Sequence, residues 1–126
     1  MKSFAILFLV GLVLTLGCSK DSDDGSPTAT INHAPVIQSM TTTPATARQN
    51  DSWGPLLQCI ATDADGDSLK YYWSCDNGSL DGAEDLAPSV RYYAGSAPRG
   101  DQWIKVQVSD SHAVVIDSVK VVVIPN

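Results

Sequence analysis

IKVQVSD, at residues 104–110, alternates strictly between apolar and polar side chains. Successive side chains of a β-strand point to opposite faces, so Ile104, Val106 and Val108 are expected to face a core. Lys105 and Gln107 would then face water. Turn residues follow at 110–112, and an apolar run at 119–124 can return antiparallel to the first strand. The two runs predict a β-hairpin in the last part of the chain.

The same alternation extends upstream of this hairpin. Residues 69–75 read LKYYWSC, which places Tyr71 and Trp73 on an inward face and Tyr72 on the opposite face. Further strands are expected at 36–42, 56–62 and 89–93, separated by clusters of Gly, Pro, Asp and Asn. Beyond residue 31 no window sustains apolar residues at helical spacing. About seven strands predict an all-β domain over residues 32–126, built as a two-sheet antiparallel sandwich.

The N-terminal segment has the composition of an export signal. Lys2 precedes an apolar stretch at 4–16, which is shorter than the roughly 20 residues that a membrane-spanning helix needs. Residues 14–18, LTLGC, resemble the lipobox of bacterial lipoproteins, in which a small residue precedes an acylated cysteine. The resemblance implies that residues 1–17 are removed and that Cys18 becomes the lipidated N-terminus. An ordinary signal peptide with an incidental cysteine is the alternative.

Residues 18–31 are polar and acidic, so they predict a solvated tether between anchor and domain. In lipoproteins that resemble this one, a serine such as Ser19 after the cysteine goes with delivery to the outer membrane. The resemblance therefore implies a cell-envelope location, with the membrane contacted through the lipid anchor. The formal charge of the whole chain is −6, which argues against nucleic acid as a partner.

Three segments occur in the order typical of PKD and cadherin-like modules. They are NHAPVI at 32–37, ATDADGDSLKYYW at 61–73, and residues 100–110. The domain therefore resembles these modules of the immunoglobulin-like β-sandwich class over nearly its whole length. The resemblance implies a domain that binds, adheres or assembles.

The cysteines beyond the signal form a pair. With Cys18 assigned to acylation, Cys59 and Cys75 remain in an exported and oxidising compartment, and strand alternation points both inward. In immunoglobulin-like domains a disulfide crosses the core beside a tryptophan. The resemblance therefore implies a Cys59–Cys75 bridge next to Trp73, and two unpaired buried thiols are the alternative.

An acidic cluster lies between two predicted strands. Asp63, Asp65 and Asp67 are spaced at i, i+2 and i+4, and carboxylate oxygens are the ligands that Ca²⁺ prefers. A calcium site is one interpretation, with Asp110, by resemblance to cadherin-like loops, and Asn32 as further ligands. A tight turn in which aspartate caps backbone amides is the other.

Aromatic side chains are the predicted contact surface. Alternation places Tyr72 and Trp103 on outward faces, with Trp53 and Tyr93 in or near loops, where they could stack on a glycan or meet an envelope protein. Scattered aromatics are also ordinary on a sheet surface, and this is the alternative.

No catalytic constellation is apparent in the sequence. The two histidines, His33 and His112, stand beside no recognisable nucleophile motif, so no enzymatic activity is expected. The sequence predicts a lipid-anchored envelope protein that presents a non-catalytic binding, adhesion or structural module. Alternatives are a calcium- or carbohydrate-binding accessory module of envelope enzymes, and a subunit that polymerises through edge strands at the outward Val122 and Ile124.

Overall fold

The computed structural model describes residues 29–126, and residues 31–126 form one compact unit. The export signal at 1–17, Cys18 and most of the tether at 18–31 lie outside the described residues. Within the described part of the chain, no helix has the length and apolar character needed to cross a membrane.

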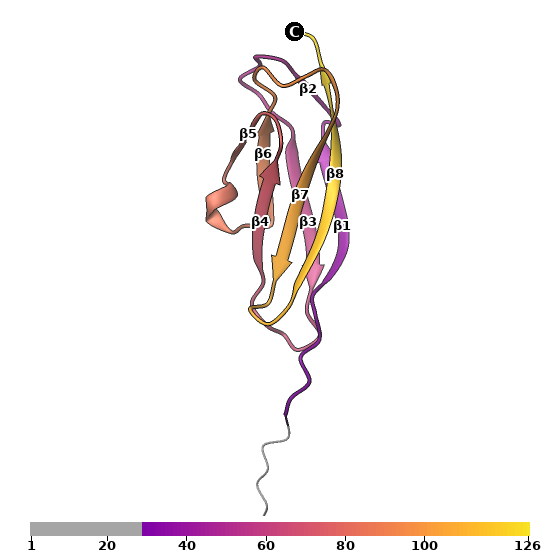
Figure 1. Ribbon diagram of the computed structural model, residues 1–126, viewed down its shortest axis with the longest axis vertical. Coiled ribbons are helices and arrows are strands. Elements are labelled where there is room, and N and C mark those ends of the chain that lie inside the picture. The colour runs from indigo at the N-terminus through magenta and orange to yellow at the C-terminus, as the bar shows by residue number, and fades with distance from the viewer. Residues whose placement is uncertain (1–28) are drawn as a thin grey trace, which may run out of the picture. The chain divides into compact units, whose positions relative to one another are not determined.

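Eight strands form two sheets that pack face to face (Figure 1). The first sheet contains, in spatial order, β1 (Val36–Thr43), β3 (Leu56–Thr62), β6 (Ser89–Tyr93) and β5 (Ser79–Asp81). The second sheet contains β2 (Thr46–Arg48), β8 (Val114–Ile124), β7 (Gly100–Ser109) and β4 (Lys70–Cys75). A 3-10 turn, η1 (Ala83–Asp85), connects β5 to β6. The predicted all-β, two-sheet sandwich is confirmed.

The pairing is antiparallel throughout except between β2 and β8, which run parallel. The predicted C-terminal hairpin is β7 with β8, and it is longer than expected because the pairing continues down to Ser109 and Val114. β2 also changes the interpretation of Val122 and Ile124. These residues pair with Thr46 and Arg48, so β8 is an interior strand there and offers no free edge for polymerisation.

The core lies between the two sheets, as the alternation predicts. Ile104, Val106 and Val108 of β7 are fully buried, and Leu57 of β3 is buried in the facing sheet. Each such side chain contributes roughly 1.5–3 kcal/mol through the apolar area removed from water. Trp73 is buried as well, and its Nε1 donates to the backbone oxygen of Ala87 at 3.0 Å. The indole therefore joins the core to the loop that precedes β6.

The predicted disulfide is not present: Cys59 and Cys75 are both free thiols. Both side chains face inward, as expected, and they lie on different sheets. Cys59 is on β3, an interior strand, whereas Cys75 ends β4 at the edge of the other sheet, in register with Ile104. β1 lies near β8 and β5 lies near β4, so β3 is toward one side of the sandwich and β4 is at the other, and the two strands that carry the cysteines do not face each other. Burial raises the pKa of both thiols, which keeps them protonated and weakly nucleophilic.

The strands run between two ends of the sandwich (Figure 1). The tether end consists of the segment 32–35, the β3–β4 loop at 63–69 and the β7–β8 turn at 110–113. The distal end consists of the loops at 49–55 and 94–99, the β1–β2 connection and the C-terminus. Each end gathers loops from both sheets, with the acidic β3–β4 loop at the tether end and a pocket at the distal end.

Candidate functional site

The β3–β4 loop at the tether end gathers the three predicted carboxylates. One oxygen from each of Asp63, Asp65 and Asp67 lies within 4.8 Å of the others. Asp63 Oδ1 accepts the backbone N–H of Asp65 at 2.8 Å and that of Asp67 at 3.2 Å. Gly66 has a φ of 77°, a conformation that glycine adopts without steric cost. These contacts are those of a tight turn capped by an aspartate.

The loop also holds the start of the domain through His33. Its backbone N–H donates to Asp65 Oδ2 at 2.6 Å, and its ring Nδ1 lies 2.9 Å from Asp65 Oδ1. The side-chain hydrogen bond with Asp65 raises the pKa of His33, and the hydrogen bond from the His33 backbone lowers the pKa of Asp65. Both oxygens of Asp65 are thus engaged with one residue of the incoming chain.

A second contact to the incoming chain comes from the β7–β8 turn. Asp110 is buried, and its Oδ1 accepts the backbone N–H groups of His112 and Ala113, each at 2.6 Å. Its Oδ2 accepts from Asn32 Nδ2 at 2.9 Å. These hydrogen bonds, with that of Asn32 as the largest cause, lower the pKa of Asp110 to about 2. Asp110 and Asn32, predicted as further calcium ligands, therefore contact each other and close the turn.

One carboxylate oxygen of this cluster takes no part in the hydrogen bonds of the turn. Asp63 Oδ2 is buried and has no hydrogen-bond partner among the residues that the structure describes. A buried carboxylate oxygen without a partner is costly, and a hard cation would satisfy it. Ca²⁺ takes about 6–8 oxygens, however, and Asp65 and Asp110 already accept hydrogen bonds. Asp63 and Asp67 would therefore supply only part of a coordination shell.

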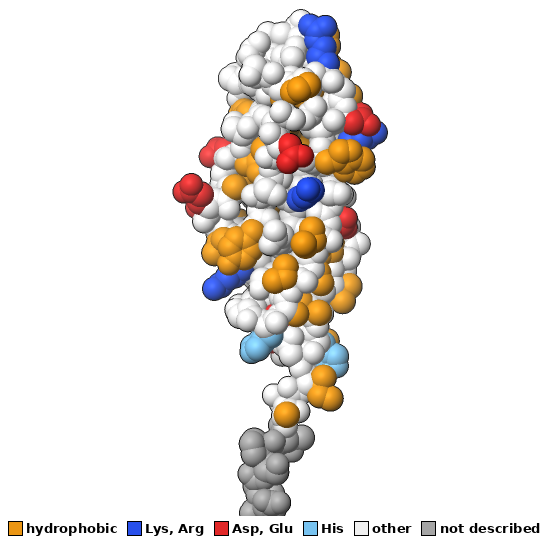
Figure 2. Space-filling view, viewed as in Figure 1, with side chains coloured by type: hydrophobic (Ala, Val, Ile, Leu, Met, Phe, Trp, Pro, Cys, Tyr) orange, Lys and Arg blue, Asp and Glu red, His pale blue; other side chains and the backbone are white. Residues whose placement is uncertain are grey.

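The predicted aromatic surface is divided. Tyr72 and Trp103 are exposed on the outer face of the second sheet, as expected. Tyr72 pairs with Gln107, which is four residues, or about 13 Å, along β7 from Trp103. Lys105 lies between them on β7, and Figure 2 shows the apolar side chains of this face in more than one group, with Lys side chains between some of them. Tyr72 and Trp103 therefore do not form one continuous surface.

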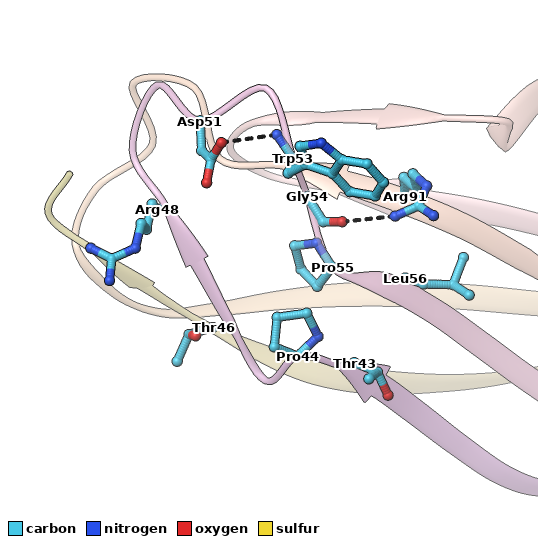
Figure 3. Close-up of a pocket in the computed structure, with 10 residues that line it drawn as sticks. All are labelled: Thr43, Pro44, Thr46, Arg48, Asp51, Trp53, Gly54, Pro55, Leu56 and Arg91. Carbon is cyan, nitrogen blue, oxygen red and sulfur yellow. Dashed lines mark hydrogen bonds between the residues drawn. The ribbon is translucent and has the colours of Figure 1, made fainter.

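A pocket of about 470 Å³ opens at the distal end (Figure 3). Trp53 is 73% exposed at its rim, and the guanidinium of Arg91 lies 5.0 Å from the centre of the Trp53 ring. Arg91 Nη1 also donates to the backbone oxygen of Gly54 at 3.1 Å. The pocket is lined by Thr43, Pro44, Thr46, Arg48, Asp51, Trp53, Gly54, Pro55, Leu56 and Arg91.

The sequence alone does not reveal this pocket, because its walls come from segments that are far apart in the chain. Thr43, Leu56 and Arg91 are neighbours in one row across β1, β3 and β6. The one local signal was Trp53, a tryptophan in a polar loop directly before Gly54 and Pro55.

Comparison with known proteins supports the fold. No protein-family model and no curated protein matches this chain. Among solved structures, it is similar to human protocadherin-24 EC1-2, with a TM-score of 0.51 and 18% sequence identity. The similarity covers 75% of this chain and 44% of that chain, so this chain matches less than half the length of its structural neighbour. At this identity the likeness establishes the fold alone, a cadherin-like β-sandwich of the immunoglobulin type.

Proposed function

We propose that this protein is a lipid-anchored protein of the cell envelope that presents a non-catalytic cadherin-like module for binding or adhesion. The observation that carries the proposal is that two loops at the tether end hold the start of the domain by hydrogen bonds. His33 is held by the β3–β4 loop and Asn32 by the β7–β8 turn. A force or a torque applied through the tether would pass into loops that join or extend both sheets. Hydrogen bonds in these positions suit a domain that is anchored at one end and contacts its partner at the other.

The anchor in this proposal is Cys18. Each buried CH₂ of an acyl chain contributes about 0.8 kcal/mol to membrane binding, and the acidic residues that follow would keep the tether solvated. We place the module at the outer membrane, with an envelope protein or a glycan as its partner. The loops of the distal end, at the other end of the sandwich from residues 32–35, are available for that contact.

The anchor is tested by metabolic labelling of the full chain with an alkyne analogue of palmitate, followed by membrane fractionation. Cys18→Ser should abolish labelling and release the protein from the membrane fraction. Cys75→Ser is the matched control and should remain labelled and membrane-bound. Labelling that persists in Cys18→Ser, or that is lost in Cys75→Ser, would contradict the anchor.

A second candidate function is calcium binding, which the buried Asp63 Oδ2 favours. Occupancy would stabilise the folded state, because a ligand that binds only the native protein raises its melting temperature. Thermal unfolding of the full chain should then shift upward in millimolar Ca²⁺ relative to chelator. Asp67→Asn should remove the shift, whereas Asp51→Asn at the distal end should retain it. Identical melting temperatures with and without Ca²⁺ would leave the loop as a turn.

A further inference from the structure

Trp53 forms the aromatic wall of the pocket at the distal end, and its ring is preorganised by other residues of the protein. Arg91 lies over one face of the Trp53 ring and is itself tied to Gly54, so the indole is oriented although it is largely exposed. An indole fixed in this way loses little conformational entropy on binding. Its uncovered face offers a flat apolar surface with a polar edge, which suits a ligand that is itself apolar on one face and polar at its rim.

The polar groups around this wall are mixed in kind. Arg48 and Arg91 provide donors, Asp51 provides a carboxylate, and the hydroxyls of Thr43 and Thr46 both donate and accept. Figure 3 shows Arg48 and Thr46 on the β2 side of the pocket, with Trp53 and Arg91 on the other side.

The pocket is lined by charges of both signs, Arg48 and Arg91 together with Asp51. The Asp51 carboxylate would repel a phosphate or another small anion, which binds best where the surrounding groups are cationic donors. Closely spaced donors and acceptors instead match a neutral ligand that carries many hydroxyl groups.

A peptide fits the lining less well. Pro44 and Pro55 have no backbone N–H to offer, and the backbone oxygens of Gly54 and Pro55 already accept from Arg91 and Tyr92. An added β-strand would therefore find few free main-chain partners. Grooves that bind proline-rich helices are lined by aromatic side chains, and among the described residues of this lining Trp53 alone is aromatic.

We propose that the pocket beside Trp53 binds a neutral carbohydrate, with one sugar ring packed on the uncovered face of the indole and its hydroxyls bonded to Arg48 and Asp51. The volume of about 470 Å³ lies within the range of roughly 300–1,000 Å³ that small-ligand sites occupy. The proposal rests on the proposed function in that it assigns the partner class of the anchored module. Under this proposal the residue that contacts the glycan is Trp53, and not Tyr72 or Trp103 as the sequence suggested.

The test is calorimetric titration of the purified full chain with soluble oligosaccharides. The probes are oligomers of β-linked glucose, β-linked N-acetylglucosamine and α-linked mannose, with an oligogalacturonate as the acidic counterpart and a proline-rich peptide as the non-carbohydrate ligand. We expect at least one neutral oligomer to bind. Trp53→Ala should weaken that binding about tenfold or more, as expected when an aromatic anchor is truncated. Trp103→Ala is the matched control, since Trp103 is exposed on another face, and it should bind as the unmodified chain does.

A second variant keeps the charge of the pocket while changing its geometry. Arg91→Lys removes the planar fork that covers the indole, and it should also weaken sugar binding while the melting temperature is retained. The proposal is overturned if no oligomer binds, if Trp53→Ala binds normally, or if only the oligogalacturonate or a proline-rich peptide binds. The anchor and the sugar site can fail independently, because Cys18→Ser would change membrane fractionation and leave sugar binding unchanged.

Discussion

Asp65 is bound by His33 twice, through the backbone N–H at 2.6 Å and through ring Nδ1 at 2.9 Å. The pKa of His33 is raised, so this contact contributes fully below the unfolded pKa of about 6.5 and is lost as the pH rises through the folded value. The pKa of Asp65 is lowered, so the contribution also falls away as the pH drops from about 3.9 through the folded value. The start of the domain is therefore held best in mildly acidic solution.

Asp65→Asn should return the pKa of His33 toward its ordinary value, because the neutral amide no longer favours the charged imidazole. The measurement is a pH titration of the His33 ring protons by NMR in the presence of chelator. Asp51→Asn, which changes a carboxylate at the distal end, should leave the His33 titration unaltered. An unchanged His33 titration in Asp65→Asn would contradict the contact.

Tyr92 is fully buried, and its hydroxyl has no hydrogen-bond partner within the described part of the chain. Tyr92→Phe keeps the ring and removes a buried hydroxyl that makes no hydrogen bond in the folded protein. We expect the free energy of unfolding to stay the same or to rise by up to about 1 kcal/mol. Urea denaturation measures this change. Trp73→Phe is the contrasting variant, and it should lose about 1–3 kcal/mol because it removes volume and the bond to Ala87.

At the scale of the elements, the loop that leads into β3 passes very close to β6. A Cβ atom on Gly54 would overlap the backbone oxygen of Tyr92 and lie 2.7 Å from its carbonyl carbon. Both obstacles are backbone, so neither can move aside as a side chain would. The conformation of this loop, and with it the position of Trp53, depends on glycine at this point.

Gly54→Ala should therefore destabilise the fold by more than about 4 kcal/mol, which is a loss found for severe steric conflicts. Urea denaturation of the variant and of the unmodified chain gives the difference. Gly95→Ala is the control, because nothing lies within 4 Å of the Cβ position there and the φ of 52° costs only about 1–2 kcal/mol. Equal losses in the two variants would exclude the close approach as the cause.

At the scale of the whole molecule, the sandwich is held by packing between its sheets and contains two free thiols. Cys59 is buried on an interior strand and Cys75 is partly buried at an edge. The core between them includes Trp73 and the fully buried valines of β7. Stability that comes from packing does not depend on the redox state of the surroundings.

Exported Cys18→Ser protein should therefore contain two thiols that iodoacetamide modifies after unfolding in guanidinium. In the folded protein Cys59 should resist modification, since burial raises its pKa and excludes the reagent. Mass spectrometry counts the modified thiols, and the melting temperature should be the same with and without reductant. A mass lower by two hydrogens, or a melting temperature lowered by reductant, would show that Cys59 and Cys75 form a disulfide.

Local alternation in the sequence was sufficient to identify the strands at 56–62, 69–75, 89–93 and 104–110 and the inward faces of most. It works because the two-residue period is a property of each strand's own backbone, whatever strands lie beside it. The turn character of Asp63 to Asp67 is local for the same reason. Strands as short as β2 and β5, three residues each, carry no measurable period and were missed.

The amino-acid sequence by itself thus determined an all-β sandwich, the hairpin of β7 with β8, the inward Trp73 and the outward Tyr72 and Trp103. Only the tertiary structure decided that Cys59 and Cys75 stay apart and that Thr43, Leu56 and Arg91 share the pocket beside Trp53. The physical reason is that strand order within a sheet arises from hydrogen bonding and packing between segments distant in the chain. No local pattern specifies which of two inward-facing strands lies at an edge, or which loops meet at one end.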